Sequence, residues 1–296
     1  MTTTFDQSLY DELTARNRGF VPRQTQQLLQ TATVLVAGCG STGGASVEPL
    51  ARLGVQNFLL ADNGCYELNN LNRQAAYLDE IGQNKADVCA RRVGGVNPQS
   101  TAEVHRAGIN SRNVDDLVDR CAVVIDGVDV TEPAGWVAKF ELHAAAARLG
   151  RPVVTGYDMA GAQYVRYYDY RRPRPAFDGR ITRQHIDSLT TWGLLRRAVP
   201  LWAVPVEMLE SARRSVATGE ESVPQVVYAS LLFGAIAAKM VVDIVGGRRV
   251  RRHTLVNVDR AIHPLAVNAF DRLRKPVVLV QALADLAATE RSARRT

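Results

Sequence analysis

The chain has 296 residues, enough for one large α/β domain or two small ones. Apolar residues make up 46% and charged residues 22%, a composition typical of globular proteins. The most apolar stretch, residues 226–245, contains Ser230, Lys239 and Asp243, so we expect it not to span a membrane. Residues 1–10 carry no secretory pattern, and we expect a cytoplasmic protein.

The net charge of +6 is modest, and arginines between residues 248 and 252 and near the C-terminus supply much of it. A nucleic-acid partner is one interpretation, but a solvated basic surface or a phosphate site is the more frequent one. The four cysteines have no CxxC spacing, and the five histidines have no metal-ligand spacing. We therefore expect neither structural zinc nor a disulfide scaffold.

Short apolar runs alternate with helical patterns after a polar, helix-prone arm. The predicted strands are 34–37, 58–62, 101–105, 121–126 and 152–156, and the predicted helices are 45–53, 85–93, 114–119 and 138–149. Alternation of this kind predicts an α/β fold in which helices cover both faces of a doubly wound, mostly parallel, Rossmann-like sheet.

The second half of the chain is less regular. Residues 163–224 are rich in proline and arginine, which predicts a long, partly ordered crossover with a helix at 206–216. An apolar helix at 226–245 and a strand at 255–258 follow, and the chain ends in a charged tail. We expect one domain with four parts: an arm (1–30), a nucleotide-binding half (31–162), the crossover or substrate segment (163–224), and the second half of the sheet with the tail (225–296).

A glycine-rich loop joins the first predicted strand to the first predicted helix. It reads Gly38-x-Gly40-x-x-Gly43, with Ser41 and Thr42 between the last two glycines. Glycines let the backbone approach a phosphate, and a helix start offers unpaired N–H groups with a partial positive charge. Asp62 ends the second strand, where a carboxylate can accept hydrogen bonds from ribose hydroxyls. These features fit NAD, FAD and ATP equally well.

Two polar loops follow Asp62 and add cations. Asn70 and Arg73 stand three residues apart, next to Gln74, and could reach a triphosphate from one side. Lys85 opens a predicted helix. A cation at a helix start opposes the helix dipole, and this cost is easier to explain if an anion binds there. Solvated surface loops are the alternative interpretation of these residues.

Two carboxylates follow the fourth predicted strand, at the rim where doubly wound sheets bind ligands. Asp126 and Asp129 suit Mg²⁺, which binds one or two carboxylates together with phosphate oxygens. Helix capping is the alternative role for both.

Several motifs in this order resemble the ThiF/MoeB/HesA family, relatives of the ubiquitin-activating enzymes. They are Gly38-x-Gly40, Asp62, Asn70-Leu71-Asn72-Arg73-Gln74, Gly82-x-x-Lys85, Asn97-Pro98 and Asp126-x-x-Asp129. The resemblance implies ATP- and Mg²⁺-dependent adenylation of a carboxylate. The glycine loop and Asp62 would hold ATP, Asn70, Arg73 and Lys85 its phosphates, and Asp129 the Mg²⁺ at the reaction centre.

The resemblance also implies a homodimer in which an arginine of the arm reaches the γ-phosphate of the opposite subunit. Arg16 is the candidate, in preference to Arg18. The chain departs from the family in three respects. Ser41 stands where a second glycine is usual, CxxC pairs are missing, and residues 163–224 contain no cysteine for a thioester or persulfide step.

The acceptor remains open at this level. The family's substrates imply a peptide or small ubiquitin-like protein first, and a modified tRNA base, dehydrated with ATP, as the alternative. An NAD-dependent oxidoreductase and a non-catalytic scaffold are further alternatives. The aromatic and arginine residues of 164–172 suit a grip on peptide or RNA, or an ordinary aromatic strand.

Overall fold

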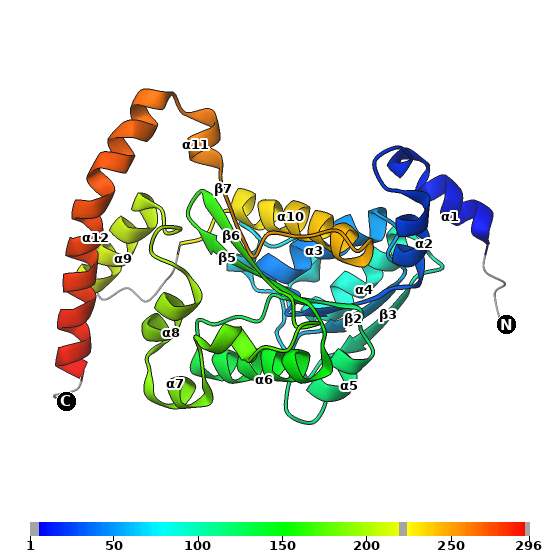
Figure 1. The fold of residues 1–296 in the computed structure, drawn as a ribbon, viewed down its shortest axis with the longest axis horizontal. Coiled ribbons are helices and arrows are strands. Elements are labelled where there is room, and N and C mark those ends of the chain that lie inside the picture. Colours follow the sequence, from blue (N-terminus) through cyan, green and yellow to red (C-terminus); the bar gives the residue numbers. More distant parts are fainter. Residues whose placement is uncertain (1–5, 219–223, 294–296) are drawn as a thin grey trace.

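The computed structural model describes residues 6–218 and 224–293. Within these residues the chain forms a seven-stranded sheet with the order β3-β2-β1-β4-β5-β6-β7 (Figure 1). The strands are β1 (Thr33–Ala37), β2 (Asn57–Ala61), β3 (Thr101–His105), β4 (Val123–Asp126), β5 (Val153–Met159), β6 (Ala162–Tyr168) and β7 (His253–Asn257). β1 to β5 are parallel, and β6 and β7 continue the sheet antiparallel. The expected α/β fold with a mostly parallel sheet is confirmed.

Helices cover both faces of the sheet (Figure 1). One face carries α2 (Arg23–Thr31), α3 (Ser41–Arg52), α4 (Lys85–Val96) and α10 (Val227–Val245), and the other carries α5 (Val114–Asp119), α6 (Pro133–Leu149), α7 (Arg183–Ser188) and α8 (Thr191–Ala198). The β1 side chains alternate between the two cores, Val34 and Val36 facing α3 and α10, and Leu35 and Ala37 facing α6. Burial on both faces explains why this strand is apolar throughout.

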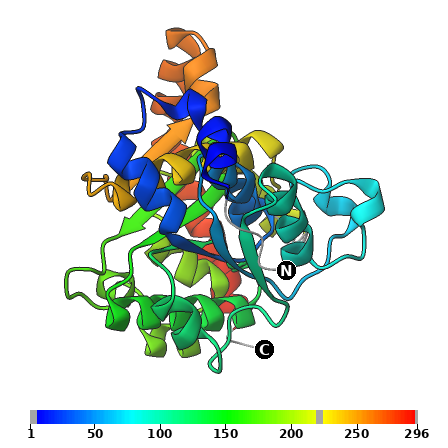
Figure 2. The ribbon, with the colours of Figure 1, turned by 90° about the vertical axis from the view of Figure 1, so that its right-hand side faces the viewer.

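The remaining helices lie at the two ends of the molecule (Figure 1). They are α1 (Gln7–Leu13) at one end, and α9 (Val206–Thr218), α11 (Val258–Ile262) and α12 (Leu265–Ala293) at the other. α9 and α12 share a small apolar cluster of Val206, Leu209, Val278 and Ala282. The loop after β2, drawn in cyan, projects from the body in Figure 2.

The structure corrects two local expectations and shows the form of the tail. The start of the crossover is regular, because β6 pairs with β5 along seven residues and buries Tyr164, Tyr167 and Tyr168. The aromatic run is therefore core and not an exposed grip. α4 continues through Gly94 and Gly95, where a break was expected. The tail is helical as far as the described residues extend.

By length and composition alone, α10 is long and apolar enough to cross a membrane. In this structure more than half of its 18-residue apolar window is buried, and it packs on α3, β5 and β6. The core helix of a globular protein has the same composition, and its burial here accounts for it.

Candidate functional site

The glycine loop packs so closely against the end of β4 that only glycine fits. Gly38 has a φ of +85°, and a Cβ there would lie 2.3 Å from the carbonyl oxygen of Gly127. A Cβ at Gly43 would lie 1.9 Å from the carbonyl oxygen of Gly38. Gly40 is the N-cap of α3 and provides no side-chain cap, so the first N–H groups of the helix remain available to an anion.

Asp62 lies beside this loop, at the end of β2. One carboxylate oxygen accepts a hydrogen bond of 2.6 Å from the Cys39 N–H, and the other accepts one of 2.7 Å from the Gly64 N–H. Burial raises the pKa of Asp62, opposed by these two N–H groups and by Lys85, while the charge of Asp129 raises it further. Lys85 and Asp129 therefore share the surroundings of Asp62.

Lys85 begins α4, which Asn84 caps by accepting hydrogen bonds from two backbone N–H groups. The Lys85 ammonium lies 5.8 Å from the centre of the Tyr66 ring and next to Gly64. It forms no ion pair with a carboxylate in the described part of the chain. A cation held at a helix start without such a partner suits an anionic ligand.

The loop after β2 carries Arg73 and Gln74. Arg73 donates hydrogen bonds to the Asn69 carbonyl (3.0 Å) and the Asn72 side chain (2.9 Å). Its Nε and the Oε1 of Gln74 are buried without a partner among the described residues. Gln74 Oε1 also faces Gly40, 3.4 Å from a Cβ built there. Buried polar atoms without a protein partner beside a cradle of glycines suit a polar ligand.

Asn70 has a different surrounding from Arg73. Its side chain is buried, donates to Asn69 (2.6 Å) and accepts from the Glu67 N–H (3.3 Å). These bonds close the short turn Leu68–Asn70 that positions Arg73. In this structure Asn70 shapes the loop.

Asp129 and Asp126 have different surroundings, although they are only three positions apart in the sequence. Asp129 is exposed, and only one of its oxygens is engaged by the protein in the described residues, accepting the Thr131 N–H across 2.9 Å. Asp126 is fully buried on the α6 side, where it meets Lys139 Nζ at 2.7 Å and His143 Nε2 at 2.9 Å. Asp129 therefore stays available to a metal, and Asp126 does not.

The expectation that Asp126 is a Mg²⁺ ligand is corrected by this pairing. Burial by itself would raise the pKa of Asp126, but Lys139 and His143 outweigh it and hold the pKa at about 2. His143 also bonds the Tyr170 hydroxyl (2.8 Å) and stacks on Phe177. Asp126 thus anchors α6 to β4 from beneath the sheet. In the described residues no cluster of three or more His, Cys, Asp or Glu side chains forms a ready metal site.

A carboxylate that the sequence did not reveal stands at the same rim. Asp158 lies near the end of β5 and accepts hydrogen bonds from Ser41 (2.8 Å) and Ser230 (3.1 Å). With its amide oriented to satisfy both of its atoms, Gln163 donates to the other oxygen across 2.6 Å. Burial raises the pKa of Asp158, against these donors and the charge of Arg73. The position of Asp158 near a strand end could have identified it as a site residue, whereas no sequence pattern pointed to Ser230.

Arg16 is far from these residues in its own chain. It is exposed and lines a groove of about 370 Å³ with Phe20, Pro49 and Leu53 and the C-terminal half of α10. Pro49 and Leu53 lie at the end of α3, whereas the glycine loop lies at its start. One chain therefore does not bring Arg16 to its own site.

Residues 14–195 match the ThiF family. The chain is 36% identical to tRNA threonylcarbamoyladenosine dehydratase of Bacillus subtilis over 86 residues, which are 29% of this chain and 34% of that protein. It is 33% identical to SAMP-activating enzyme E1 of Haloferax volcanii over 132 residues (44% and 47%). It is 34% identical to an uncharacterized protein of Mycobacterium tuberculosis over 165 residues (55% and 22%). The chain spans half or less of the length of these curated relatives.

Solved structures share the fold. The crystal structure of PaaA superposes with a TM-score of 0.61 at 18% identity, covering 87% of this chain and 74% of that one. The dehydratase TcdA of E. coli in complex with ATP superposes with a TM-score of 0.55 at 20% identity, covering 83% and 98%.

Proposed function

This chain belongs to the ThiF family, and on that premise we propose that it adenylates a carboxylate with ATP and Mg²⁺ and releases pyrophosphate. The observation that supports this best is the pair of cations beside the glycine loop. Arg73 and Lys85 flank it without carboxylate ion pairs in the described residues, and the buried Nε of Arg73 has no partner. A triphosphate supplies the oxygens that these groups lack.

The residues of the site meet the demands of this chemistry. A carboxylate oxygen of the acceptor attacks the α-phosphorus of ATP, and the bond to the bridging oxygen of the β-phosphate breaks. The nucleophile is ionised at neutral pH, so no general base is required. Catalysis consists of in-line positioning and neutralisation of negative charge. Asp62 would orient the ribose, and Arg73 and Lys85 would bind the phosphates.

Asp129 is the residue that would hold Mg²⁺. Its exposed carboxylate has an oxygen that no described residue engages, and a single carboxylate is enough for this ion when phosphate oxygens and waters complete its coordination. The bound ion would supply charge neutralisation at the phosphates. Replacement of Asp129 by alanine should abolish Mg²⁺-dependent pyrophosphate exchange, and unaltered exchange would contradict this role.

A homodimer would bring Arg16 to a site in the opposite subunit. α3 and α10 run side by side in the same direction, because Ser41 meets Ser230 at their starts, while Pro49 and Val242 share a groove near their ends. Antiparallel association of two subunits along α3 and the groove of Arg16, about a two-fold axis, would place Arg16 of each subunit near the partner's helix starts.

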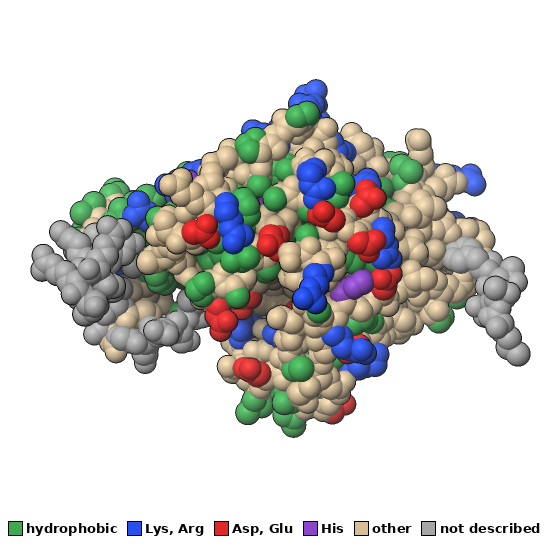
Figure 3. Space-filling view, turned by 90° about the horizontal axis from the view of Figure 1, so that it is seen from below, with side chains coloured by type: hydrophobic (Ala, Val, Ile, Leu, Met, Phe, Trp, Pro, Cys, Tyr) green, Lys and Arg blue, Asp and Glu red, His purple; other side chains and the backbone are tan. Residues whose placement is uncertain are grey.

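The acceptor that we propose is the C-terminus or a side chain of a peptide or small protein, in a cytoplasmic enzyme. The relative named SAMP-activating enzyme E1 supports this class. A tRNA base is the second candidate, because another relative is named tRNA threonylcarbamoyladenosine dehydratase. RNA requires an extended basic surface, yet acidic and basic side chains intermingle on the face seen in Figure 3.

The direct test is ATP–pyrophosphate exchange with candidate acceptors, accompanied by calorimetric titration with ATP and with NAD. We expect ATP to bind and exchange to depend on a peptide carboxylate. Binding of NAD without binding of ATP would refute the proposal. Exchange that depends on tRNA, and weakens steeply with salt, would favour the second candidate.

A further inference from the structure

β7 is the edge strand of the sheet, and part of its backbone is free to pair. The strand order ends at β7, with β6 as its neighbour. Tyr167 N–H bonds the Arg252 carbonyl, and Val258 N–H bonds the Gly161 carbonyl, so the even-numbered residues of this stretch face β6. His253 and Leu255 therefore direct N–H and C=O groups away from the sheet. No backbone group in the described residues pairs with that side of them.

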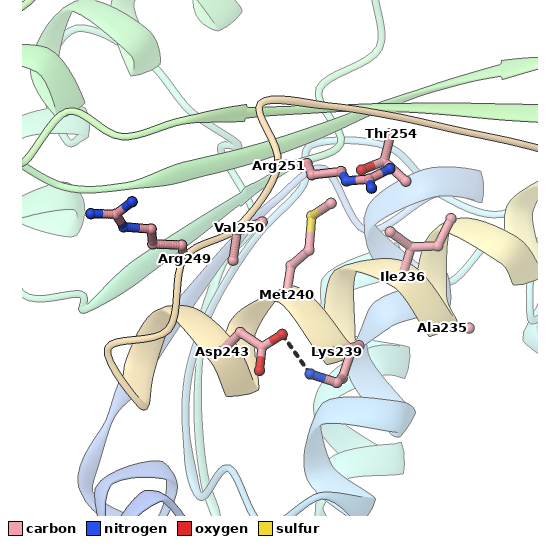
Figure 4. Close-up of a pocket in the computed structure, with 9 residues that line it drawn as sticks. All are labelled: Ala235, Ile236, Lys239, Met240, Asp243, Arg249, Val250, Arg251 and Thr254. Atoms are coloured by element: carbon pink, nitrogen blue, oxygen red, sulfur yellow. Dashed lines mark hydrogen bonds and ion pairs between the residues drawn. The ribbon is translucent and has the colours of Figure 1, made fainter.

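A groove lies beside this edge on the α10 face. It measures about 440 Å³ and is lined by Ala235, Ile236, Lys239, Met240, Asp243, Arg249, Val250, Arg251 and Thr254 (Figure 4). Lys239 pairs with Asp243 within it, whereas Arg251 lies near Thr254 of β7 (Figure 4). Arg251 is exposed and has no ion pair in the described part of the chain. The groove thus combines an apolar floor with an unpaired cation.

An aromatic side chain stands over the other face of the same edge. Trp202 is 57% exposed, and its ring centre lies 6.4 Å from that of His253 and 6.0 Å from that of Tyr164. Lys275 holds the Trp202 backbone carbonyl across 2.8 Å. An exposed large aromatic side chain held beside a free strand edge offers a surface on which an apolar side chain of a ligand can pack.

We infer that the free edge of β7 binds an extended acidic peptide as an additional, parallel strand. Strand addition uses the outward N–H and C=O groups for affinity and the flanking pockets for alternate side chains. A carboxylate side chain of the peptide would face Arg251, and an apolar one would face Trp202. That this peptide is also the acceptor of adenylation rests on the proposed function.

The direction of β7 connects this edge to the proposed adenylation site. β7 runs in the same direction as β5, because β6 is antiparallel to both. A parallel added strand therefore delivers its C-terminus to the rim that holds Asp158. Three strand spacings, about 14 Å, separate the added strand from β5. About five extended residues beyond the paired segment span that distance.

The test begins with a displayed library of random dodecapeptides, selected on the full-length protein without ATP. We expect selected peptides to carry Asp or Glu at alternate positions with apolar residues between. Synthetic copies should slow amide hydrogen exchange at His253 and Leu255. Arg251→Glu should weaken their binding about tenfold, whereas Arg112→Glu, an equal charge change at an exposed loop beyond β3, should not.

Two results would overturn the strand addition. One is a selection that yields no peptides, or only peptides without this alternation. The other is peptide binding that leaves amide hydrogen exchange at His253 and Leu255 unchanged. The two proposals fail separately. Peptide binding with no pyrophosphate exchange would remove the enzymatic proposal alone. Exchange with an unchanged KM for the peptide in Arg251→Glu would remove the docking edge alone.

Discussion

The hydroxyl of Ser41 donates a hydrogen bond of 2.8 Å to the carboxylate of Asp158. This bond joins the first residue of α3 to the end of β5, and Ser230 adds α10 to the same carboxylate. The serine that departs from the family's glycine pattern therefore has a structural partner. It joins the start of α3 to two neighbouring elements, β5 and α10.

Removal of this acceptor should loosen the loop. In Asp158→Ala, two hydroxyls and an amide lose their buried partner, which should lower the free energy of unfolding by about 1–3 kcal/mol. Asp158→Asn keeps the shape and one acceptor oxygen, so the loss should be smaller. Urea denaturation measures both values. Equal stability of Asp158→Ala and the natural protein would show that the cluster contributes nothing.

Lys85→Ala and Arg73→Ala should keep the fold and lose catalysis. Neither side chain forms an ion pair in the described structure, so thermal unfolding should change little. Loss of one preorganised cation at the phosphates should lower the exchange rate about 10²-fold or more. Arg112→Ala provides the control, because that exposed side chain lies away from the site. Unaltered exchange in both variants would exclude these residues from the reaction.

Two glycine-to-alanine changes should act in opposite directions. A Cβ at Gly43 would overlap the Gly38 carbonyl, which is backbone and cannot rotate away, so Gly43→Ala should impair folding and ATP binding. Gly94 lies inside α4 with nothing within 4 Å of the added carbon. Gly94→Ala should therefore stabilise the protein by up to about 1 kcal/mol. Thermal unfolding of the two variants measures the contrast.

Lys139→Met should destabilise the protein strongly, because it leaves Asp126 buried with His143 as its partner. Loss of one member of a buried ion pair typically costs about 3–5 kcal/mol. Denaturant unfolding at neutral pH provides the measurement. A cost below about 1 kcal/mol would contradict the role of this pair in anchoring α6.

The same pair predicts a pH dependence. The pKa of Asp126 is about 2 in the folded protein, below its ordinary value of 3.8. The stability that this difference contributes, about 2 kcal/mol, is present above about pH 4 and is lost as pH falls toward 2. Asp126→Asn should remove this part of the acid dependence. Urea unfolding at about pH 6 and about pH 3 compares the two proteins.

Arg16→Ala and Lys85→Ala should complement each other if Arg16 acts across a dimer. Each variant by itself has only defective sites. Random reassortment makes half of the dimers mixed, each with one complete site, so about a quarter of natural activity should return. Activity that stays absent after subunit exchange, verified by mass spectrometry, would contradict action of Arg16 in trans.

The sequence pattern predicted much of the fold. Strands buried on both faces must be apolar throughout, and this pattern identified Val34–Ala37 and its neighbours. The helix end expected at Gly94 was wrong: α4 continues to Val96, and no other group approaches Gly94 or Gly95 closely enough to interrupt it. The sequence pattern did not predict the burial of Tyr164 and Tyr168, because their burial depends on the pairing of β6 with β5 and β7.

Asp126 and Asp158 show how far the site could be predicted from the sequence. A strand end places a carboxylate at the rim, but which face it turns to depends on the pleat and on the helix packed there. For Asp126 that helix supplies Lys139 and His143, and both oxygens of the carboxylate are engaged. Asp158 turns instead toward the glycine loop.

The sequence by itself was sufficient to locate the glycine loop, Asp62 and the start of α4, because each lies at a strand end or a helix start that the local pattern predicts. Contacts between distant segments required the packed structure. Ser41 and Ser230 meet although 189 positions separate them, and Arg16 lies at the wrong end of α3 for its own site. Close packing of helices on a twisted sheet decides such meetings, since it depends on the shapes of all the partners at once.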